Sequence, residues 1–196
     1  MKVKYSDLKN KRVFITGGGS GIGASIVEHF CEQGSEVYFV DINIKETNKL
    51  LKIIKKKRFR KPNFIECNLL DINKLEKIIK KIISTKGPIH ALVNSAANDD
   101  RHTTDQVDEK YWENRMAINL KHYFFAAKAV VKAMKKIKSG SIVNLSSVSW
   151  MLGEGDKVVY ETAKSAVVGL TRSFAQEYGK YNIRTNSVIP GSIATE

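Results

Sequence analysis

The chain has 196 residues, of which 42% are hydrophobic, and a formal net charge of +13. This composition is typical of a globular protein with a sizeable core and excludes a disordered chain. No apolar run is long enough to cross a bilayer, and residues 1–7 lack the apolar segment of a signal peptide. We therefore expect a single domain over residues 1–196, located in the cytoplasm without a membrane partner, in which Cys31 and Cys67 are reduced.

Basic residues gather at 55–58, 77–81 and 132–138. Binding to nucleic acid is one interpretation of this charge. The three groups are not interleaved with aromatic residues, however, and each lies at the end or on the outer face of a predicted helix. We expect a solvated lysine-rich surface and no nucleic-acid partner.

The first apolar run, 12–16, leads into Thr16-Gly-Gly-Gly-Ser-Gly-Ile-Gly23 and then into a helical pattern. A strand, a glycine-rich turn and a helix in this order can receive a pyrophosphate, because glycine lets the backbone approach closely and helix N–H groups bind phosphate. An ordinary tight turn is the alternative. A second apolar run ends at Asp41, where an acidic residue would bind the adenosine ribose of a dinucleotide.

Short apolar runs alternate with helical patterns along the rest of the chain. The expected strands are 12–16, 36–41, 63–67, 89–94, 141–146 and 183–188, and the expected helices are 21–33, 43–56, 71–86, 108–137 and 158–180. This alternation predicts an α/β fold with a three-layer, doubly wound parallel sheet. Small, polar and turn-forming residues follow most of the expected strands, which favours a ligand along the carboxyl edge of the sheet.

Tyr160 and Lys164 are four residues apart, on one face of the expected helix 158–180. A nearby ammonium lowers the pKa of a phenol from about 10, which would let the tyrosine act as a base. A surface pair is the alternative interpretation. Ser147, at the end of the preceding strand, favours a catalytic pair. Its hydroxyl can donate a hydrogen bond to a substrate oxygen while Tyr160 accepts or donates the proton.

Several of these motifs together resemble the short-chain dehydrogenase/reductase family. They are Thr16–Gly23, Asn94-Ser-Ala-Ala97, Ile118-Asn119-Leu120, Ser147 placed 13 residues before Tyr160, Tyr160-Glu-Thr-Ala-Lys164 and Asn186–Gly191. The resemblance implies a Rossmann fold and an NAD-dependent oxidoreductase. Members of this family are usually longer, so we expect this chain to lack the substrate lid and the last strand of the sheet.

The resemblance also implies residue roles. Tyr160 would be the general acid/base, Lys164 would bind the nicotinamide ribose and lower the tyrosine pKa, Ser147 would orient the substrate, and Asn119 would hold a water that relays protons. The cofactor-binding residues would be Gly17, Gly19, Ser20, Gly21, Ile22, Gly23, Asp41, Asn68, Leu69, Asn94, Ala96, Tyr160, Lys164, Pro190, Gly191, Ile193 and Thr195. Asp41 resembles the acidic residue of NAD-preferring members, and no metal site is expected.

Two further segments are similar to those of bacterial aldose (pentose) 1-dehydrogenases. They are Asn98-Asp-Asp-Arg-His102 and Ser149-Trp-Met-Leu-Gly153. The resemblance implies oxidation of an aldose at C1 to a lactone, with the sugar bound by Asp99, Arg101, His102, Ser147, Trp150 and Tyr160. An ordered salt-bridged loop and a core tryptophan are the structural alternative for the two segments.

Two other functions stay open at this point. One is an oxidoreductase for a different secondary alcohol or ketone, such as a 3-hydroxyacyl compound or a polyol, and the other is a non-catalytic dinucleotide-sensing protein. Apolar residues line the outer faces of the expected helices 108–137 and 158–180. In the family these helices pair across subunits, which implies a homodimer or homotetramer, while packing on the sheet is the alternative.

Overall fold

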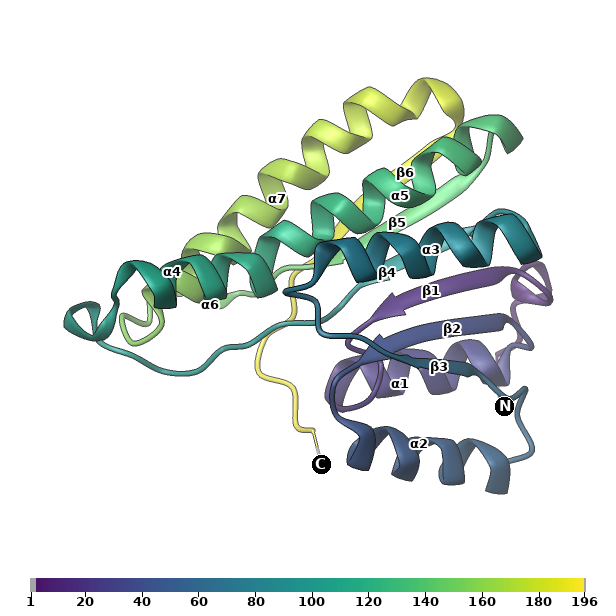
Figure 1. Cartoon of the computed structure of the whole chain (residues 1–196), viewed down its shortest axis with the longest axis horizontal. Helices are drawn as coiled ribbons and strands as arrows, with labels where there is room; N and C mark the ends of the chain where they lie inside the picture. The colour runs from purple at the N-terminus through teal and green to yellow at the C-terminus, as the bar shows by residue number, and fades with distance from the viewer. Residues whose placement is uncertain (1–2, 196) are drawn as a thin grey trace.

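The six apolar runs form one parallel sheet in the order β3-β2-β1-β4-β5-β6 (Figure 1). The computed structural model describes residues 3–195. Its strands are β1 (Arg12–Thr16), β2 (Glu36–Asp41), β3 (Asn63–Glu66), β4 (Ala91–Asn94), β5 (Gly140–Leu145) and β6 (Ile183–Val188). The strand order reverses between β1 and β4, and sheets of this kind bind ligands outside the carboxyl ends at that point. The predicted doubly wound α/β fold is confirmed.

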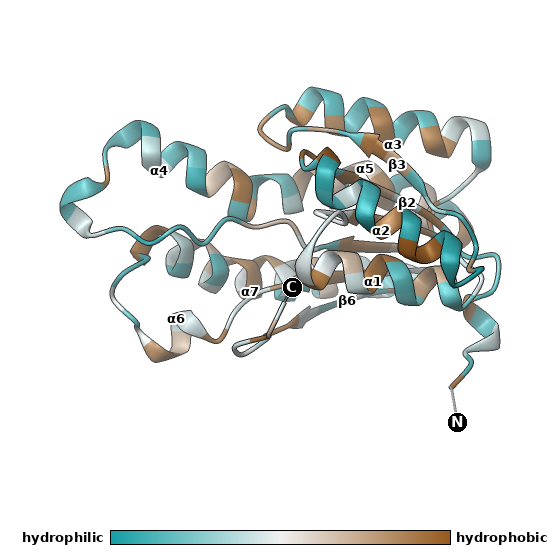
Figure 2. Ribbon diagram, turned by 90° about the horizontal axis from the view of Figure 1, so that it is seen from below, coloured by the Kyte–Doolittle hydropathy of each residue, from teal (hydrophilic) through white to brown (hydrophobic). Residues whose placement is uncertain are grey.

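Helices cover both faces of the sheet. One face carries α1 (Gly21–Glu32) and α2 (Ile44–Lys56), and the other carries α3 (Ile72–Lys86), α5 (His122–Ile137) and α7 (Val158–Tyr178). In α2 and α3 the buried residues recur every three or four positions, and Figure 2 shows hydrophobic and hydrophilic stretches alternating along both helices. This spacing gives each helix one apolar side for the sheet.

Consecutive residues of β1 enter two different cores. Val13 and Ile15 pack with α1 and α2, whereas Phe14 packs with α3 and α5, and all three side chains are fully buried. Side chains alternate along a strand, so a strand covered on both faces must be apolar at every position. This requirement explains why the expected strands are continuous apolar runs.

The remaining elements are short. They are α4 (Glu109–Met116), α6 (Ser149–Leu152), the 3-10 turns η1 (Ser6–Leu8), η2 (Thr104–Gln106) and η4 (Gly179–Tyr181), and the π-helical turn η3 (Ala117–Lys121). The expected helix 108–137 is therefore two α-helices joined by a π turn, and α6 was not predicted. Within residues 3–195, none of the helices is long and apolar enough to cross a membrane.

The N-termini of the helices differ in how they are capped. Asn43, Asp71 and Asp108 accept backbone N–H bonds at the starts of α2, α3 and α4. Such a cap stabilises a helix by about 1 kcal/mol. The helices α1 and α7 have no capping bond from their own N-cap side chains. Both begin at the carboxyl edge of the sheet, beside the cavity described next.

Candidate active site

A cavity of about 640 Å³ lies at the carboxyl ends of the strands. It is lined by most of the residues that the sequence singled out: Gly17, Ser20, Gly21, Ile22, Gly23, Asp41, Asn68, Leu69, Ala96, Asp99, Arg101, Ser147, Tyr160, Lys164, Pro190, Gly191, Ile193 and Thr195. Segment 189–195 runs from β6 toward the start of α1 and forms part of the wall (Figure 1). Residues far apart in the chain thus meet at one edge of the sheet.

The glycine turn leaves no room for side chains. A Cβ on Gly23 would lie 1.8 Å from the Gly17 carbonyl oxygen, and a Cβ on Gly17 would lie 2.5 Å from Ala96 Cα. Gly17 also has a φ of +67°, which glycine adopts without steric cost. The turn therefore packs backbone against backbone and brings the start of α1 to the cavity.

Asp41 is fixed beside this turn. Its Oδ2 accepts the Gly19 N–H at 2.8 Å, and its Oδ1 accepts the Asn43 N–H at 2.8 Å. Gly19 itself does not line the cavity but supports the aspartate. The carboxylate is thereby held at the end of β2, at the mouth of the cavity.

These features fit a dinucleotide. The first-turn N–H groups of α1 have no intrahelical acceptors and no side-chain cap, so they are free to bind phosphate oxygens. At the glycines no side chain blocks the approach of a phosphate to the backbone. The Asp41 carboxylate lines the cavity and can accept hydrogen bonds from ribose hydroxyls. The residues that would hold the cofactor are thus present and oriented toward one cavity.

At the other end of the cavity, Ser147 follows β5 and Tyr160 and Lys164 extend from the first turns of α7. Ser147 Oγ lies 2.9 Å from Ser149 Oγ. Burial raises the pKa of Tyr160 above its ordinary value, while a hydrogen bond with Ser147 acts in the opposite direction. The net direction is upward, so the Tyr160 side chain carries its proton at neutral pH.

Lys164 is almost fully buried, and burial lowers its pKa to about 7. Its Nζ donates to Tyr123 Oη at 2.9 Å and to the Leu145 carbonyl oxygen at 2.8 Å, and it lies 5.5 Å from the centre of the Tyr160 ring. In the protein without cofactor, the pKa of Tyr160 is therefore raised and not lowered. The lowering expected from Lys164 together with a bound oxidised nicotinamide stays a prediction. The Lys164 ammonium binds other oxygens, and desolvation is the largest influence on the pKa of the Tyr160 phenol.

Asn119 and Asn94 do not line the cavity. Asn119 sits in the π turn, where its Oδ1 accepts the Asn98 N–H at 2.8 Å and its Nδ2 donates to the Asn98 carbonyl at 2.9 Å. These two bonds tie the loop after β4 to the π turn, and each polar atom keeps a second bonding position. The water expected at Asn119 stays a prediction. Asn94 is fully buried and donates to Asn144 Oδ1 at 2.9 Å, which places it beneath the site.

His102 does not line the cavity either. Its Nε2 accepts the Val159 N–H at 3.3 Å, and the Tyr111 hydroxyl lies 2.9 Å from its Nδ1. The imidazole is 6% exposed and supplies the acceptor that the first turn of α7 otherwise lacks. His102 thus joins the loop after β4 to the helix that carries Tyr160. Its expected contact with substrate stays a prediction.

Trp150 is half-buried, and its Nε1 donates to Ser146 Oγ at 3.2 Å. The indole does not line the cavity, and the cover over a sugar ring that was expected of it stays a prediction. Asp99 and Arg101, in contrast, do line the cavity. Arg101 also forms an ion pair with Asp156.

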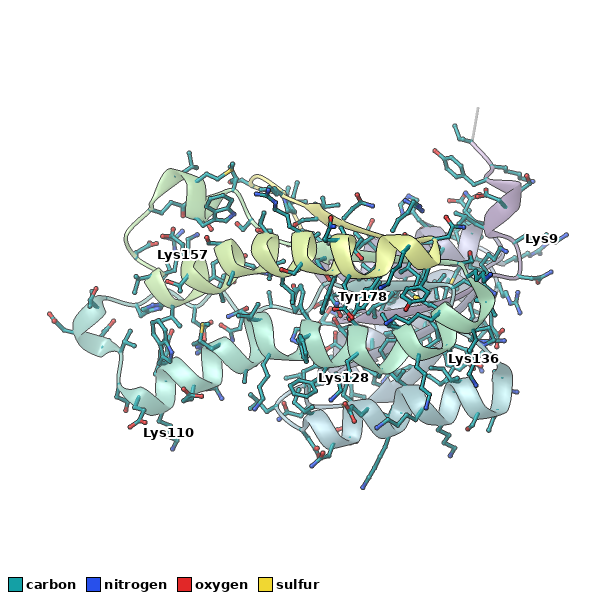
Figure 3. The ribbon with its side chains drawn as sticks, turned by 90° about the horizontal axis from the view of Figure 1, so that it is seen from above. Lys9, Lys110, Lys128, Lys136, Lys157 and Tyr178 are labelled. Carbon is teal, nitrogen blue, oxygen red and sulfur yellow. The ribbon has the colours of Figure 1, made fainter. Side chains whose placement is uncertain are left out.

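Two charged residues of the wall were missed by sequence reasoning. Lys157 is 8% exposed, its Nζ lies 2.6 Å from Glu154 Oε2, and both residues line the cavity. Figure 3 labels Lys157 at the N-terminal end of α7. Glu154 stands between Gly153 and Gly155, whose φ values are +66° and +80°. The sequence did contain a signal, because a charged Gly-Glu-Gly-Asp-Lys run ends only three residues before Tyr160.

The chain is similar to known proteins in both sequence and fold. A family model described as short chain dehydrogenase matches residues 11–196. A D-xylose 1-dehydrogenase of Caulobacter vibrioides is 41% identical over 192 residues, which cover 98% of this chain and 75% of that protein. A probable galactose dehydrogenase of Rhizobium meliloti is 38% identical over 193 residues, with the same coverage of 98% and 75%. The ligand-free aldohexose dehydrogenase of Thermoplasma acidophilum superposes with a TM-score of 0.86 at 31% identity, over 97% of this chain and 70% of that one.

Proposed function

Since this chain belongs to the short-chain dehydrogenase family of oxidoreductases, which use nicotinamide dinucleotides, we propose that it is a cytoplasmic NAD-dependent dehydrogenase that oxidises an aldose at C1 to a lactone. One observation carries the proposal: Ser147, Tyr160 and Lys164 line the same cavity as the glycine turn and Asp41. A dinucleotide-sensing protein would need the glycine turn but not the three polar side chains at the far end.

The proposed chemistry uses these three side chains. Tyr160 takes the proton of the C1 hydroxyl, and Ser147 donates a hydrogen bond to the same oxygen. With cofactor bound, the Lys164 ammonium would favour the phenolate form of Tyr160, which can accept that proton. When bound, the oxidised nicotinamide accepts the hydride that leaves C1. The C1 carbon and its oxygen thereby become the carbonyl of the lactone.

The preference for NAD over NADP is supported by Asp41. Its carboxylate is held by the N–H groups of Gly19 and Asn43. A carboxylate fixed there accepts a ribose hydroxyl and repels a phosphate at the same position. Neighbouring Ser20 and Ile42, which also line the cavity, carry no positive charge to compensate.

The sugar substrate is supported by the polar wall near Tyr160 and by the relatives named for xylose, galactose and aldohexoses. Asp99, Arg101, Glu154 and Lys157 present donors and acceptors at the cavity. A polyhydroxylated ring needs several of both kinds, because each buried hydroxyl must keep its hydrogen bonds. A long acyl chain would instead have to desolvate these charges.

We also propose that the enzyme is a homodimer or homotetramer. Trp112 on α4, Phe124 on α5 and Val158 on α7 are 38%, 42% and 37% exposed, respectively. Large apolar side chains exposed on adjacent helices are typical of interfaces between subunits. Light scattering coupled to size-exclusion chromatography tests this: a mass of one chain at micromolar concentration would contradict it.

The function is tested by the rate of NADH formation, followed spectrophotometrically, with a panel of substrates. D-Xylose, D-galactose and D-glucose represent aldoses, and a polyol and a 3-hydroxyacyl thioester represent the alternative alcohols. We expect turnover with at least one aldose, and a lactone as its product. Turnover of the thioester alone would favour the alternative oxidoreductase, and tight NADH binding without any turnover would favour a sensor.

A further inference from the structure

Tyr123 lies against Lys164 in the centre of the molecule. It belongs to α5, and its side chain is fully buried. Its Oη is 2.9 Å from Lys164 Nζ and 3.0 Å from the Leu145 carbonyl oxygen, with the Ala96 carbonyl oxygen at 3.3 Å. Neither the family motifs in the sequence nor the proposed chemistry gives this phenol a role.

The protons in this cluster can be assigned by counting donors. The pKa of Tyr123 is raised, chiefly by burial, so the phenol keeps its proton. That proton is donated to a backbone carbonyl, since carbonyl oxygens only accept. The lone pairs of Oη are then free for an N–H of Lys164. Leu145 O accepts a second N–H at 2.8 Å.

An ammonium group has three N–H donors, so one remains. We propose that Tyr123 is a positioning residue that, together with the Leu145 carbonyl, holds two N–H groups of the Lys164 ammonium and leaves the third for the cavity. The proposal rests on the roles proposed above for Lys164 and Tyr160. It adds that this chain fixes the lysine through a phenol contributed by a different helix.

Tyr123 does not pass protons onward. Its hydroxyl is bounded by Lys164 on one side and by backbone carbonyls on the other, and a carbonyl oxygen cannot accept a proton and release it in the same way. The benefit is electrostatic instead. A hydrogen bond to the charged form of a buried lysine opposes the desolvation that lowers its pKa.

The other ionisable groups around Lys164 are few. Asp99 raises the pKa of Lys164, and its attraction is secondary to burial. His122, fully buried next to Tyr123, has a pKa lowered to about 3, so it is neutral and adds no charge at working pH. Tyr160 carries its proton in the protein without cofactor. Asp99 acts on Lys164 in the wild type and in a variant alike, so removal of the Tyr123 hydroxyl should still lower the pKa of Lys164.

The test uses the full chain without cofactor and follows lysine ε-carbons by NMR after ε-13C-lysine labelling. In the wild type we expect the Lys164 signal to titrate near pH 7 and to show a nuclear Overhauser effect to the Tyr123 ring. In Tyr123→Phe, loss of a hydrogen bond to the charged group should lower this pKa by about one unit.

Tyr38→Phe is the matched control. Tyr38 is also buried, and its hydroxyl bonds to Glu36 Oε1 at 2.8 Å, at the opposite end of β2 from Asp41. This variant should lose comparable thermal stability and leave the Lys164 titration unchanged. A Lys164 pKa that is equal in wild type and Tyr123→Phe, or a wild type without the Overhauser contact, overturns the proposal whether or not the variant is fully stable.

Kinetics separate this proposal from the proposed function. With an aldose that the wild type oxidises, Tyr123→Phe should shift the acidic limb of kcat to higher pH, because a less protonated Lys164 no longer favours the phenolate of Tyr160. An unshifted limb contradicts the positioning role while the dehydrogenase assignment stands. A wild type that oxidises no aldose, but still shows the shifted Lys164 titration in Tyr123→Phe, would contradict only the proposed function.

Discussion

Backbone forms the wall of the cavity at the glycine turn, whereas charged side chains form it near Tyr160. At the turn, Gly17, Gly23 and Ala96 pack main chain against main chain, and the Asp41 carboxylate is held by two N–H groups. Near Tyr160, Lys157 pairs with Glu154 and Arg101 pairs with Asp156, all on loops or a helix start. The glycine turn suits a ligand whose shape does not vary. The wall near Tyr160 can be adapted to different ligands by substitution of its side chains.

The two ends also tolerate change differently. Where main chain packs against main chain, a single added Cβ disrupts the turn, because no side-chain rotamer can relieve the clash. A side-chain wall can lose one group and keep its shape. We therefore expect substitutions at the turn to act on folding and cofactor binding together, and substitutions near Tyr160 to separate stability from substrate affinity.

The largest effect is expected for Gly23→Ala. The new Cβ would lie 1.8 Å from the Gly17 carbonyl oxygen, so the turn must move. We expect NADH binding to be lost and the free energy of unfolding to fall by about 3 kcal/mol, measured by fluorescence titration and urea denaturation. Gly169→Ala is the control. No atom lies within 4 Å of its added Cβ, and the variant should gain about 0.5–1 kcal/mol. Equal behaviour of the two variants would contradict the backbone-built turn.

Asp41→Ala should change the choice of cofactor. It removes the acceptor for the Gly19 N–H and the proposed partner of the ribose hydroxyls. We expect kcat/KM for NAD to fall about 10- to 100-fold, the range for a lost hydrogen bond to a charged group, while NADP is used better than before. An NAD/NADP selectivity that is the same as in the wild type would show that Asp41 does not discriminate.

His102→Ala should affect stability more than substrate affinity. It removes the acceptor of the Val159 N–H at the start of α7, which leaves a buried donor unpaired. The expected cost is about 1–3 kcal/mol in the free energy of unfolding, together with a lower kcat. Arg101→Ala, whose side chain is mostly exposed at the cavity, is the comparison: it should raise KM for the sugar and leave stability nearly unchanged. If His102→Ala instead raised KM for the sugar without a loss of stability, His102 would have to be assigned to substrate binding.

The smallest effect is expected for Trp150→Phe. The indole donates one hydrogen bond to Ser146 Oγ and does not reach the cavity wall. Phenylalanine keeps most of the apolar contact, so we expect a loss of about 1 kcal/mol in stability and an unchanged KM for the sugar. A markedly raised KM would mean that the tryptophan covers the substrate after all.

The same contrast explains how much could be predicted from the sequence. The strands, the glycine turn and Asp41 follow from local patterns, since apolar runs and glycine spacing determine them directly. His102 and Trp150 were expected to bind the sugar because their short segments resemble those of aldose 1-dehydrogenases. A short segment does not indicate the direction in which its side chains point. His102 turns inward because α7 has no other acceptor for the Val159 N–H.

Partners distant in sequence were beyond the reach of local patterns. Tyr123 meets Lys164, which lies 41 positions away, only after α5 and α7 have packed side by side on β5. Similarly, Asn119 binds the backbone of Asn98 because the helix widens into a π turn there, and helical periodicity alone gives no sign of that turn. Such contacts are decided by tertiary packing.

The Tyr160→Phe variant decides whether Tyr160 is the acid/base of a dehydrogenase site. The measurement is steady-state NADH formation from the best aldose, compared with NADH affinity by fluorescence. We predict a fall in kcat of about 100- to 10,000-fold, the usual contribution of general acid–base catalysis, with NADH affinity and melting temperature close to those of the wild type. A Tyr160→Phe enzyme that retains the wild-type kcat would contradict the account.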